Sequence, residues 1–159
     1  MLGISSFRSD RFGPSTPEEL AALEGELGIH LPHVYHWICL AYGKFLLVCI
    51  DSKGDDGSLY SFGSWIDARA ALAHVKSPPD EFSPDCLAVS DDGLGNYHCL
   101  GIRGHRRGKV YFWIHDIGWG PVAEEYVSKG MPAPDGIATP CFHFISEDIH
   151  RIIMSFVSY

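Results

Sequence analysis

The chain has 159 residues, of which 46% are hydrophobic and 13% aromatic, so it can bury one sizeable core and is too apolar to be intrinsically disordered. Its 20 aspartates and glutamates outnumber 12 lysines and arginines, and the resulting net charge of -8 disfavours direct binding of nucleic acid, which needs clustered cations. No stretch approaches the ~20 apolar residues of a membrane span, and the first residues lack a secretory signal. We therefore expect a cytoplasmic protein that makes no membrane contact.

The five cysteines are scattered through apolar segments and form no Cys-x-x-Cys pair; they stand at positions 39, 49, 86, 99 and 141. Zinc sites and disulfide frameworks need closer spacing than this. Reduced, buried thiols are the simplest interpretation. We expect no metal and no cofactor.

The segment Thr16-Pro17-Glu18-Glu19 predicts the start of the first helix, because it combines an N-cap threonine, a proline at the first helical position and a glutamate at the third. Gly28 is expected to end this helix. Its leucines predict a buried stripe, while its glutamates are expected to face outward. The buried set is Leu20, Leu23 and Leu27, and the outward set is Glu18, Glu19, Glu24 and Glu26.

The next elements alternate between helix and strand. Leu31-Pro32 opens a second helix, in which apolar residues recur at helical spacing up to Gly43. Residues 45–50 form an apolar run of strand length, and residues 59–62 are expected to return as its partner. A third helix is predicted to begin at Ser64-Trp65-Ile66-Asp67 and to end before Pro78-Pro79, and residues 86–89 form a further strand.

The stretch from Asp91 to Asp116 joins an acidic, glycine-rich turn to two segments rich in aromatic and β-branched residues. Residues 96–102 and 109–114 predict an antiparallel hairpin around the basic tip at residues 103–108, which is interpreted as a solvated turn. We expect Ile102 to pair with Lys109. Alternation then puts Tyr97, Cys99, Val110, Phe112 and Ile114 on the core face, and His98, Leu100, Tyr111 and Trp113 on a face that is either covered or offered to a partner.

The C-terminal part begins with an irregular connection at residues 117–140, which is either a packed surface loop or a partner-contacting one. Ser146-Glu147-Asp148 then opens a helix whose apolar stripe suits docking on a sheet. The chain therefore predicts an N-terminal arm at residues 1–15 and a single α+β domain at residues 16–159.

Several short motifs follow one another in a recognisable order. In the front half they are Leu27-Gly28-Ile29, Leu31-Pro32, Tyr35 and Tyr42; behind them come Asp92-Gly93, Gly95-Asn96-Tyr97, Cys99-Leu100, Gly108-Lys109-Val110-Tyr111, Trp113 and His115-Asp116. The combination resembles the SUKH superfamily of bacterial immunity proteins, which are related to a fungal regulator of cell-wall synthesis. Gly101 and Ile114 depart from the family pattern, in which acidic residues are common at both positions.

The resemblance implies an α+β fold in which a mostly antiparallel twisted sheet is flanked by helices. It also implies a non-enzymatic immunity protein of a bacterial polymorphic toxin system, which neutralises a cognate toxin by binding it. An acidic, aromatic-lined surface would suit a basic nuclease toxin. The alternative is an intracellular adaptor or regulator of the cell-wall assembly type, and a homodimer is left open.

The candidate contact residues lie along the hairpin and its rims: Asp91, Asp92, Asn96, Tyr111, Trp113, His115 and Asp116. The competing hypothesis is a metal-dependent hydrolase, in which Asp92, His98, His115 and Asp116 converge as metal ligands or as an acid/base pair. Neither a metal-spacing motif nor a nucleophile motif accompanies these residues, so we expect no catalytic residue and no metal ligand.

Overall fold

The structure is a computed structural model of the whole chain, and it describes residues 13–44, 46–53, 59–80, 82–115 and 142–155. Within these ranges six strands form one sheet in the order β1-β2-β3-β4-β5-β6, and each strand runs antiparallel to its neighbour. The strands are β1 (Leu46–Lys53), β2 (Leu59–Trp65), β3 (Cys86–Asp91), β4 (Tyr97–Gly101), β5 (Val110–Trp113) and β6 (Phe142–Ser146). None of the helices in the described part is long and apolar enough to cross a membrane.

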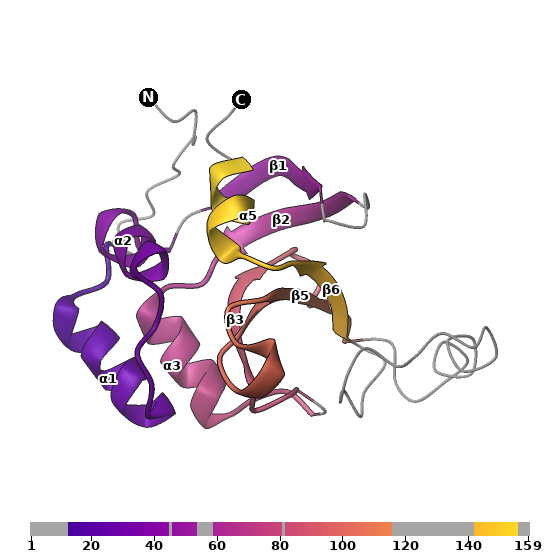
Figure 1. Cartoon of the computed structure of the whole chain (residues 1–159). Coiled ribbons are helices and arrows are strands. Elements are labelled where there is room, and N and C mark those ends of the chain that lie inside the picture. The colour runs from indigo at the N-terminus through magenta and orange to yellow at the C-terminus, as the bar shows by residue number, and fades with distance from the viewer. Residues whose placement is uncertain (1–12, 45, 54–58, 81, 116–141, 156–159) are drawn as a thin grey trace.

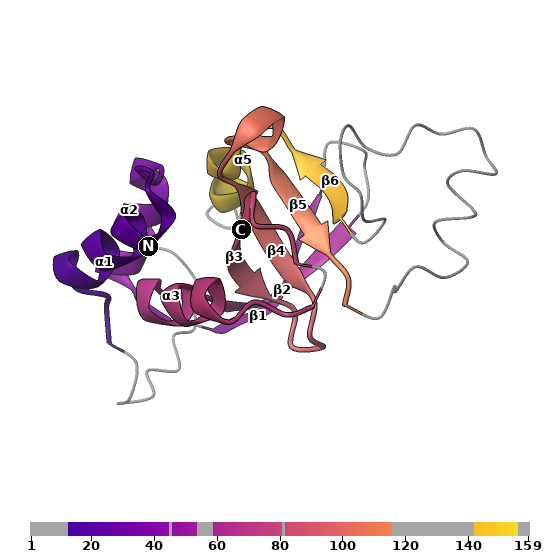
Figure 2. The same cartoon turned by 90° about the horizontal axis from the view of Figure 1, so that it is seen from below.

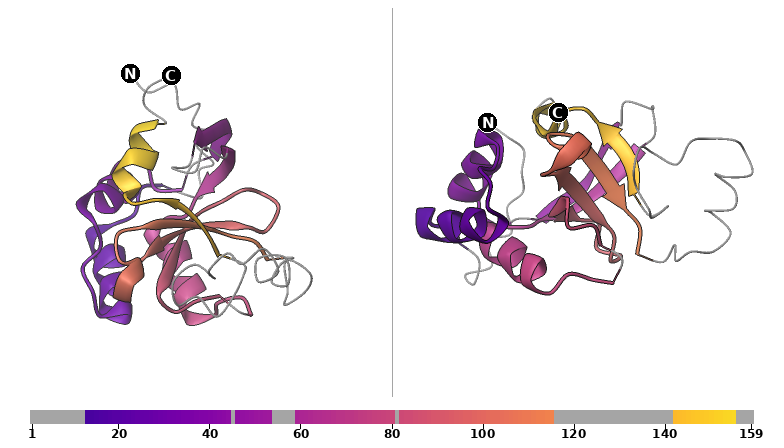
Figure 3. Two further views of the ribbon diagram at one scale, coloured as in Figure 1. Left: turned by 45° about the vertical axis from the view of Figure 1, so that its right-hand side comes forward. Right: turned by 60° about the horizontal axis from the view of Figure 1, so that its bottom comes forward.

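The helices gather beside the sheet, as Figure 1 shows, and they are α1 (Pro17–Leu27), α2 (His33–Ala41), α3 (Ala68–Lys76) and α5 (Ile149–Ser155). From below, α1, α2 and α3 lie to one side of the strands (Figure 2). Helix α5 packs against both β1 and β6, the first and last strands, because the sheet is strongly twisted (Figure 3). The predicted α+β fold with an antiparallel twisted sheet is confirmed.

Helix α1 forms as its sequence predicts. The Thr16 hydroxyl accepts a hydrogen bond from the Glu19 amide and the Glu19 carboxylate accepts one from the Thr16 amide, while Gly28 ends the helix in the left-handed region. All three leucines of the predicted stripe are buried. Glu24, however, does not face outward: its carboxylate accepts a hydrogen bond from the Leu31 amide at 2.7 Å and lies 2.9 Å from Nε2 of His36. It therefore joins α1 to the start of α2.

The chain before α1 is already packed at Ser15, a residue that the sequence assigned to the N-terminal arm. Its amide donates to the carbonyl of Cys39 at 2.8 Å, and its hydroxyl accepts from the amide of Ala68 at 3.2 Å. Ser15 thus links the C-terminal end of α2 to the N-terminal end of α3. Residues 1–12 of the predicted arm lie outside the described residues.

Helix α3 begins at the last residue of the predicted capping segment, residues 64–67. Asp67 is its N-cap, and its carboxylate accepts a hydrogen bond from the Ala70 amide at 2.8 Å. Ser64 and Trp65 instead complete β2, where they pair with Asp91 and Ser90 of β3. The local capping signal was present in the sequence, but backbone pairing with a distant strand decides which residue starts the helix.

The β4–β5 hairpin is present, but the predicted register is wrong by one residue. Tyr97 pairs with Trp113 and Leu100 with Val110, so Lys109 falls opposite Gly101 rather than Ile102. A slip of one residue changes which side chains of β5 share a face with those of β4. The core face therefore carries His98, Leu100, Val110 and Phe112, and the opposite face carries Tyr97, Cys99, Tyr111 and Trp113.

Both faces of the sheet are buried. The main core lies between the sheet and the helices, and it includes the leucines of α1 and Ile149, Ile152 and Ile153 of α5. A second cluster occupies the other face and consists of Cys86, Cys99, Tyr111, Trp113 and Phe142, with Phe82, Tyr97 and Phe144 packed against it. Cys39, Cys86 and Cys99 are buried free thiols, as the sequence predicted.

The C-terminal segment contains one strand that the sequence analysis did not predict. Strand β6 pairs with β5, and Phe142 lies opposite Trp113. The predicted closing helix follows as α5. The irregular connection at residues 117–140, and the end of the predicted apolar stripe at Phe156 and Val157, lie outside the described residues.

Candidate functional site

The turn between β3 and β4 is held rigid by its own carboxylates. Oδ1 of Asp91 accepts a hydrogen bond from the Gly93 amide at 3.0 Å. The Asp92 carboxylate accepts three, from the amide of Leu94 at 2.8 Å, the amide of Asn96 at 3.1 Å and the side-chain nitrogen of Asn96 at 2.7 Å. Side chains that bond to nearby amides in this way fix a turn without regular structure. Both aspartates were predicted contact residues, and the structure places both in this turn.

Asn96 also ties the turn to the end of β5. Its side-chain oxygen accepts a hydrogen bond from the His115 amide at 3.1 Å and lies 3.0 Å from Nδ1 of His115. The His115 ring covers the backbone of Gly95, where an added Cβ would lie 2.9 Å from its Cε1. Asp92, Asn96 and His115 therefore form one connected rim, and Gly95 leaves room for the imidazole.

Leu94 stands at the apex of this rim with 76% of its surface exposed. It is the most exposed large hydrophobic residue in the described part of the chain. Its amide donates to the Asp92 carboxylate, so the side chain is presented on a turn that is fixed by hydrogen bonds. Leu94 was not among the predicted contact residues, although an apolar residue flanked by Gly93 and Gly95 in an acidic turn was an available signal.

Burial of Asp91 raises the pKa of its carboxyl above the usual range, although the Gly93 amide and Lys44 act in the opposite direction. Burial is the largest of these effects because a half-buried carboxylate loses part of its hydration. Gly63 of β2 contributes to this crowding: an added Cβ there would lie 2.9 Å from the Asp91 carbonyl oxygen. The rim therefore packs closely on β2.

Tyr111 and Trp113 do not join the rim. Both are buried in the second cluster, where Trp113 is only 3% exposed and stacks on Tyr97 with ring centroids 5.6 Å apart. They pack on the face of the hairpin that is opposite the main core. Asp116, the last predicted contact residue, lies outside the described residues.

Comparison with known protein families assigns the chain. The model of the SMI1/KNR4 family (SUKH-1) matches residues 14–128, well over half of the sequence. The chain belongs to the SMI1/KNR4 family (SUKH-1). Comparison with curated proteins finds no match. The matched range covers the predicted rim, from Asp91 to His115, whereas β6 and α5 of this SUKH-1 protein lie beyond it.

The structure places two residues of the alternative hydrolase site, His98 and His115, in different surroundings, and Asp116 lies outside the described residues. His98 is fully buried on the core face, where burial lowers the pKa of its imidazole to about 3. It stacks on Phe62 with ring centroids 3.6 Å apart, while His115 is exposed at the rim. The described residues of this SUKH-1 domain hold no group of three histidine, cysteine, aspartate or glutamate side chains suited to a metal ion.

The cysteines offer no nucleophile in the described part of the chain. Burial raises the pKa of Cys39 and of Cys86 to about 11, and it raises that of Cys99 well above the ordinary value. A thiol is nucleophilic only as thiolate, so these buried groups are unreactive at neutral pH. Their position in the two cores of the SUKH-1 fold explains their presence by packing.

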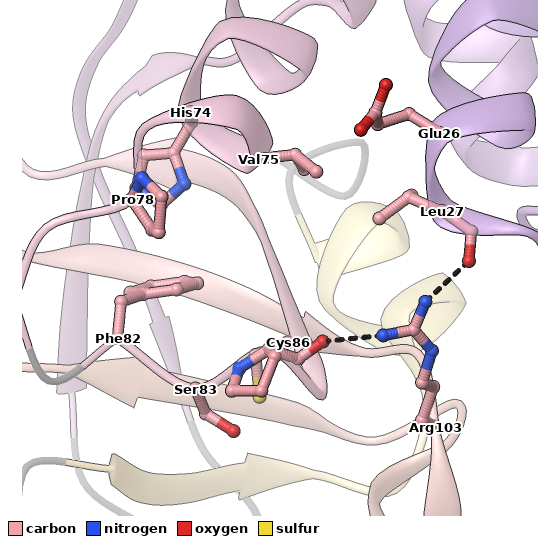
Figure 4. Close-up of a pocket in the computed structure, with 10 residues that line it drawn as sticks. Glu26, Leu27, His74, Val75, Pro78, Phe82, Ser83, Cys86 and Arg103 are labelled. Carbon is pink, nitrogen blue, oxygen red and sulfur yellow. Dashed lines mark hydrogen bonds between the residues drawn. The ribbon is translucent and has the colours of Figure 1, made fainter.

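A small cleft opens between the C-terminal ends of α1 and α3, as Figure 4 shows. Its volume is about 180 Å³, and Leu27, Val75 and Phe82 are among its apolar lining residues. Arg103 reaches across it to donate to the carbonyl oxygen of Leu27 at 2.5 Å and to that of Pro84 at 3.3 Å. The arginine thus satisfies a free carbonyl at the end of α1. Its role here is structural.

Proposed function

We propose that this SUKH-1 domain is a non-enzymatic immunity protein, which binds and neutralises a cognate toxin of a bacterial polymorphic toxin system. The observation that carries the proposal is the family match over residues 14–128. The geometry supports a binding role: the rim residues are used to fix a turn, the described cysteines are buried free thiols, and His98 is buried in the core.

The charge of the chain supports a basic partner such as a nuclease toxin. At a net charge of -8, long-range attraction would speed association with a cationic protein, and added salt would weaken that effect. A nuclease presents cations wherever it holds phosphates. An acidic protein can bind such a surface through its carboxylates, without contacts that imitate the nucleic acid bases.

The β3–β4 rim is the contact surface that we propose for the toxin. It combines an exposed apolar side chain, Leu94, with the carboxylates of Asp91 and Asp92. A rigid turn loses little conformational entropy on binding, which favours affinity. Because Asp92 also holds the turn together, its substitution would disturb both structure and binding; Leu94 tests contact alone.

Co-expression with the toxin encoded next to the gene tests the proposal. We expect wild-type protein to protect the cells and to co-purify with the toxin. Leu94→Arg should abolish protection, because it places a cation and a long side chain in the centre of the contact. Ala22→Arg is the control, since Ala22 is an exposed residue on α1, outside both the β3–β4 rim and helix α2. Absence of both protection and a complex with the wild-type protein would overturn the immunity function.

The second candidate function is an intracellular adaptor or regulator of the cell-wall assembly type. The observation that favours it is a second exposed apolar surface on α2, where Trp37 is 49% exposed and packs edge-on against Tyr42. Exposed tryptophan is typical of protein contacts. Deleting the gene in a host that lacks the toxin separates the two functions: sensitivity to a wall-active antibiotic, restored by wild type but not by Trp37→Ala, would favour the adaptor.

A further inference from the structure

The β4–β5 connection is the one basic segment in the described part of this acidic chain. It carries Arg103, His105, Arg106 and Arg107 ahead of Lys109. The sequence predicts a solvated turn, and this prediction is wrong for part of the segment, because Arg106 is buried. The binding capacity of the connection therefore depends on which of these cations bond to other residues of the domain and which remain available to a ligand.

Arg106 is used within the fold. It is the last residue of a short 3-10 helix, Gly104–Arg106, and its side chain is buried. Its Nη1 donates to Oγ of Ser83 at 2.8 Å, and its guanidinium lies over the rings of Tyr111 and Phe142, 5.9 and 5.5 Å from their centroids. Stacking on aromatic faces compensates a buried guanidinium for lost water. The connection is therefore anchored in the second cluster.

The backbone of the connection is fixed as well. The amide of Gly108 donates to the Gly101 carbonyl at 2.9 Å, and the amide of Lys109 donates to the Arg106 carbonyl at 3.0 Å. Gly101 lies so close to Arg106 that a Cβ at this position would stand 1.9 Å from the Arg106 carbonyl oxygen. With Arg106 anchored below, Arg107 projects from a backbone that is already ordered.

Arg107 borders a cavity of about 180 Å³ between this connection and the segment that joins α1 to α2. Aliphatic side chains line the cavity together with His30 and Arg107, and His30 Nδ1 lies 3.6 Å from the carboxylate of Glu24. Among the described residues Arg107 has no ion-pair partner. The aliphatic lining residues are Ile29, Leu31, Leu100 and Ile102.

We propose that this groove binds an acidic peptide segment of a protein partner. A carboxylate of the segment pairs with the guanidinium of Arg107, in the two-point geometry that arginine favours, and a neighbouring aliphatic side chain fills the cavity. The complementarity has two parts, since Arg107 is a cation without an ion-pair partner among the described residues and much of the lining is aliphatic. Because Arg107 is presented by an ordered turn, little entropy is lost when it forms the pair.

Nucleic acid fits this groove less well than a peptide. A phosphate backbone needs a row of cations, whereas Arg103 donates to two carbonyls and Arg106 is buried, which leaves Arg107 at the cavity. The net charge of -8 opposes a polyanion of many phosphates more strongly than a short peptide with two carboxylates, and the aliphatic lining suits the apolar side chains of a peptide. The proposal rests on the proposed protein-binding function only in taking the ligand to be a protein segment, and it does not require that the partner be a toxin.

Fluorescence anisotropy of the full-length protein with a fluorescein-labelled peptide, Gly-Leu-Glu-Leu-Asp-Gly, tests the proposal. We expect saturable binding that weakens with salt. Arg107→Gln should weaken it about tenfold, as expected for the loss of one charge-assisted pair. Ile29→Glu should weaken it at least as much, because it introduces a carboxylate into the groove. Lys76→Gln, which removes one exposed cation on α3, is the matched control and should bind as wild type.

Three outcomes would overturn the proposal: no binding of this peptide by wild type, equal binding by wild type and by folded Arg107→Gln and Ile29→Glu variants, or tighter binding of a labelled single-stranded RNA than of the peptide. Thermal unfolding shows whether each variant is folded. The toxin survival assay is run on the same variants. If wild type protects the cells but does not bind the peptide, the groove proposal is wrong and the immunity function is unaffected. If wild type binds the peptide but does not protect the cells, the immunity function is wrong and the groove proposal is unaffected.

Discussion

The imidazole of His98 lies parallel to the ring of Phe62, with centroids 3.6 Å apart and planes at 14°. Neither ring nitrogen of this fully buried histidine has a hydrogen-bond partner among the described residues. Burial therefore keeps the imidazole neutral and lowers its pKa from 6.5 to about 3. The histidine packs as an aromatic ring in the main core, and its protonation is incompatible with that packing.

This arrangement predicts a loss of stability in mild acid. The folded pKa is below the unfolded one, so stability from neutral His98 is fully present above pH 6.5 and is lost as the pH falls from 6.5 toward 3. By about pH 5 the free energy of unfolding should have fallen by ~2 kcal/mol. Urea unfolding of wild type and His98→Phe across this pH range measures the effect. The variant should lose much less stability than wild type, and a pH dependence as steep as that of wild type would contradict the assignment.

The close approach of Gly101 to Arg106 predicts that Gly101→Ala is strongly destabilising. The added Cβ would stand 1.9 Å from a backbone oxygen, which cannot move without disturbing the anchored connection, so we expect a cost of about 3 kcal/mol or more. Gly25→Ala is the matched control, because nothing lies within 4 Å of an added Cβ in α1. That substitution should stabilise the protein by ~0.5–1 kcal/mol, as alanine does in a helix interior. Equal effects of the two substitutions in urea unfolding would rule out the close contact.

How much of the fold the sequence predicts depends on the range of the interactions involved. The ends of α1 at Thr16 and Gly28 were predicted because caps are decided by a few neighbouring residues. The β4–β5 register was not, because both faces of the hairpin are apolar and alternation alone cannot tell which set faces the helices. Strand β6 was missed because its partner lies far along the chain.

The same reasoning applies to the candidate site. The turn at Asp92 was predictable, since aspartate before glycine is a local turn signal. The burial of Arg106 was not predictable, because arginine is seldom buried unless it has partners. Its aromatic partners Tyr111 and Phe142 are brought together only when β5 and β6 pair. Hydrogen bonds join Asp92, Asn96 and His115, whereas Tyr111 and Trp113 lie in the second cluster; that any of them contacts a partner stays a prediction.

Glu24 predicts a measurable link between α1 and α2. Partial burial opposes its ionisation, but hydrogen bonds from the Leu31 amide and from His36 lower the pKa of its carboxyl. Removing a charged, part-buried acceptor leaves the Leu31 amide without its partner, so Glu24→Ala should cost about 2 kcal/mol in urea unfolding. Glu26→Ala is the control on the same helix, because Glu26 makes only an exposed 3.9 Å contact with Lys76. A cost no greater than that of the control would show that the link is unimportant.

Trp113 and Leu94 should separate folding from toxin binding. Trp113 packs in the second cluster against Tyr97, Phe82 and Phe142, so Trp113→Ala should lower the free energy of unfolding by about 3–5 kcal/mol. Leu94 is exposed, so Leu94→Ala should leave stability within about 0.5 kcal/mol of wild type.

Pull-down with the toxin then gives the second readout for both positions. Leu94→Ala should weaken the complex at unchanged stability, because it removes an apolar anchor from a rigid turn. Trp113→Phe keeps an aromatic ring in the cluster and should retain toxin binding wherever the variant is folded. If Trp113→Phe instead abolishes the complex while its unfolding curve matches that of wild type, the tryptophan itself must reach the partner, and the second face of the sheet, not the β3–β4 rim, would be the contact surface.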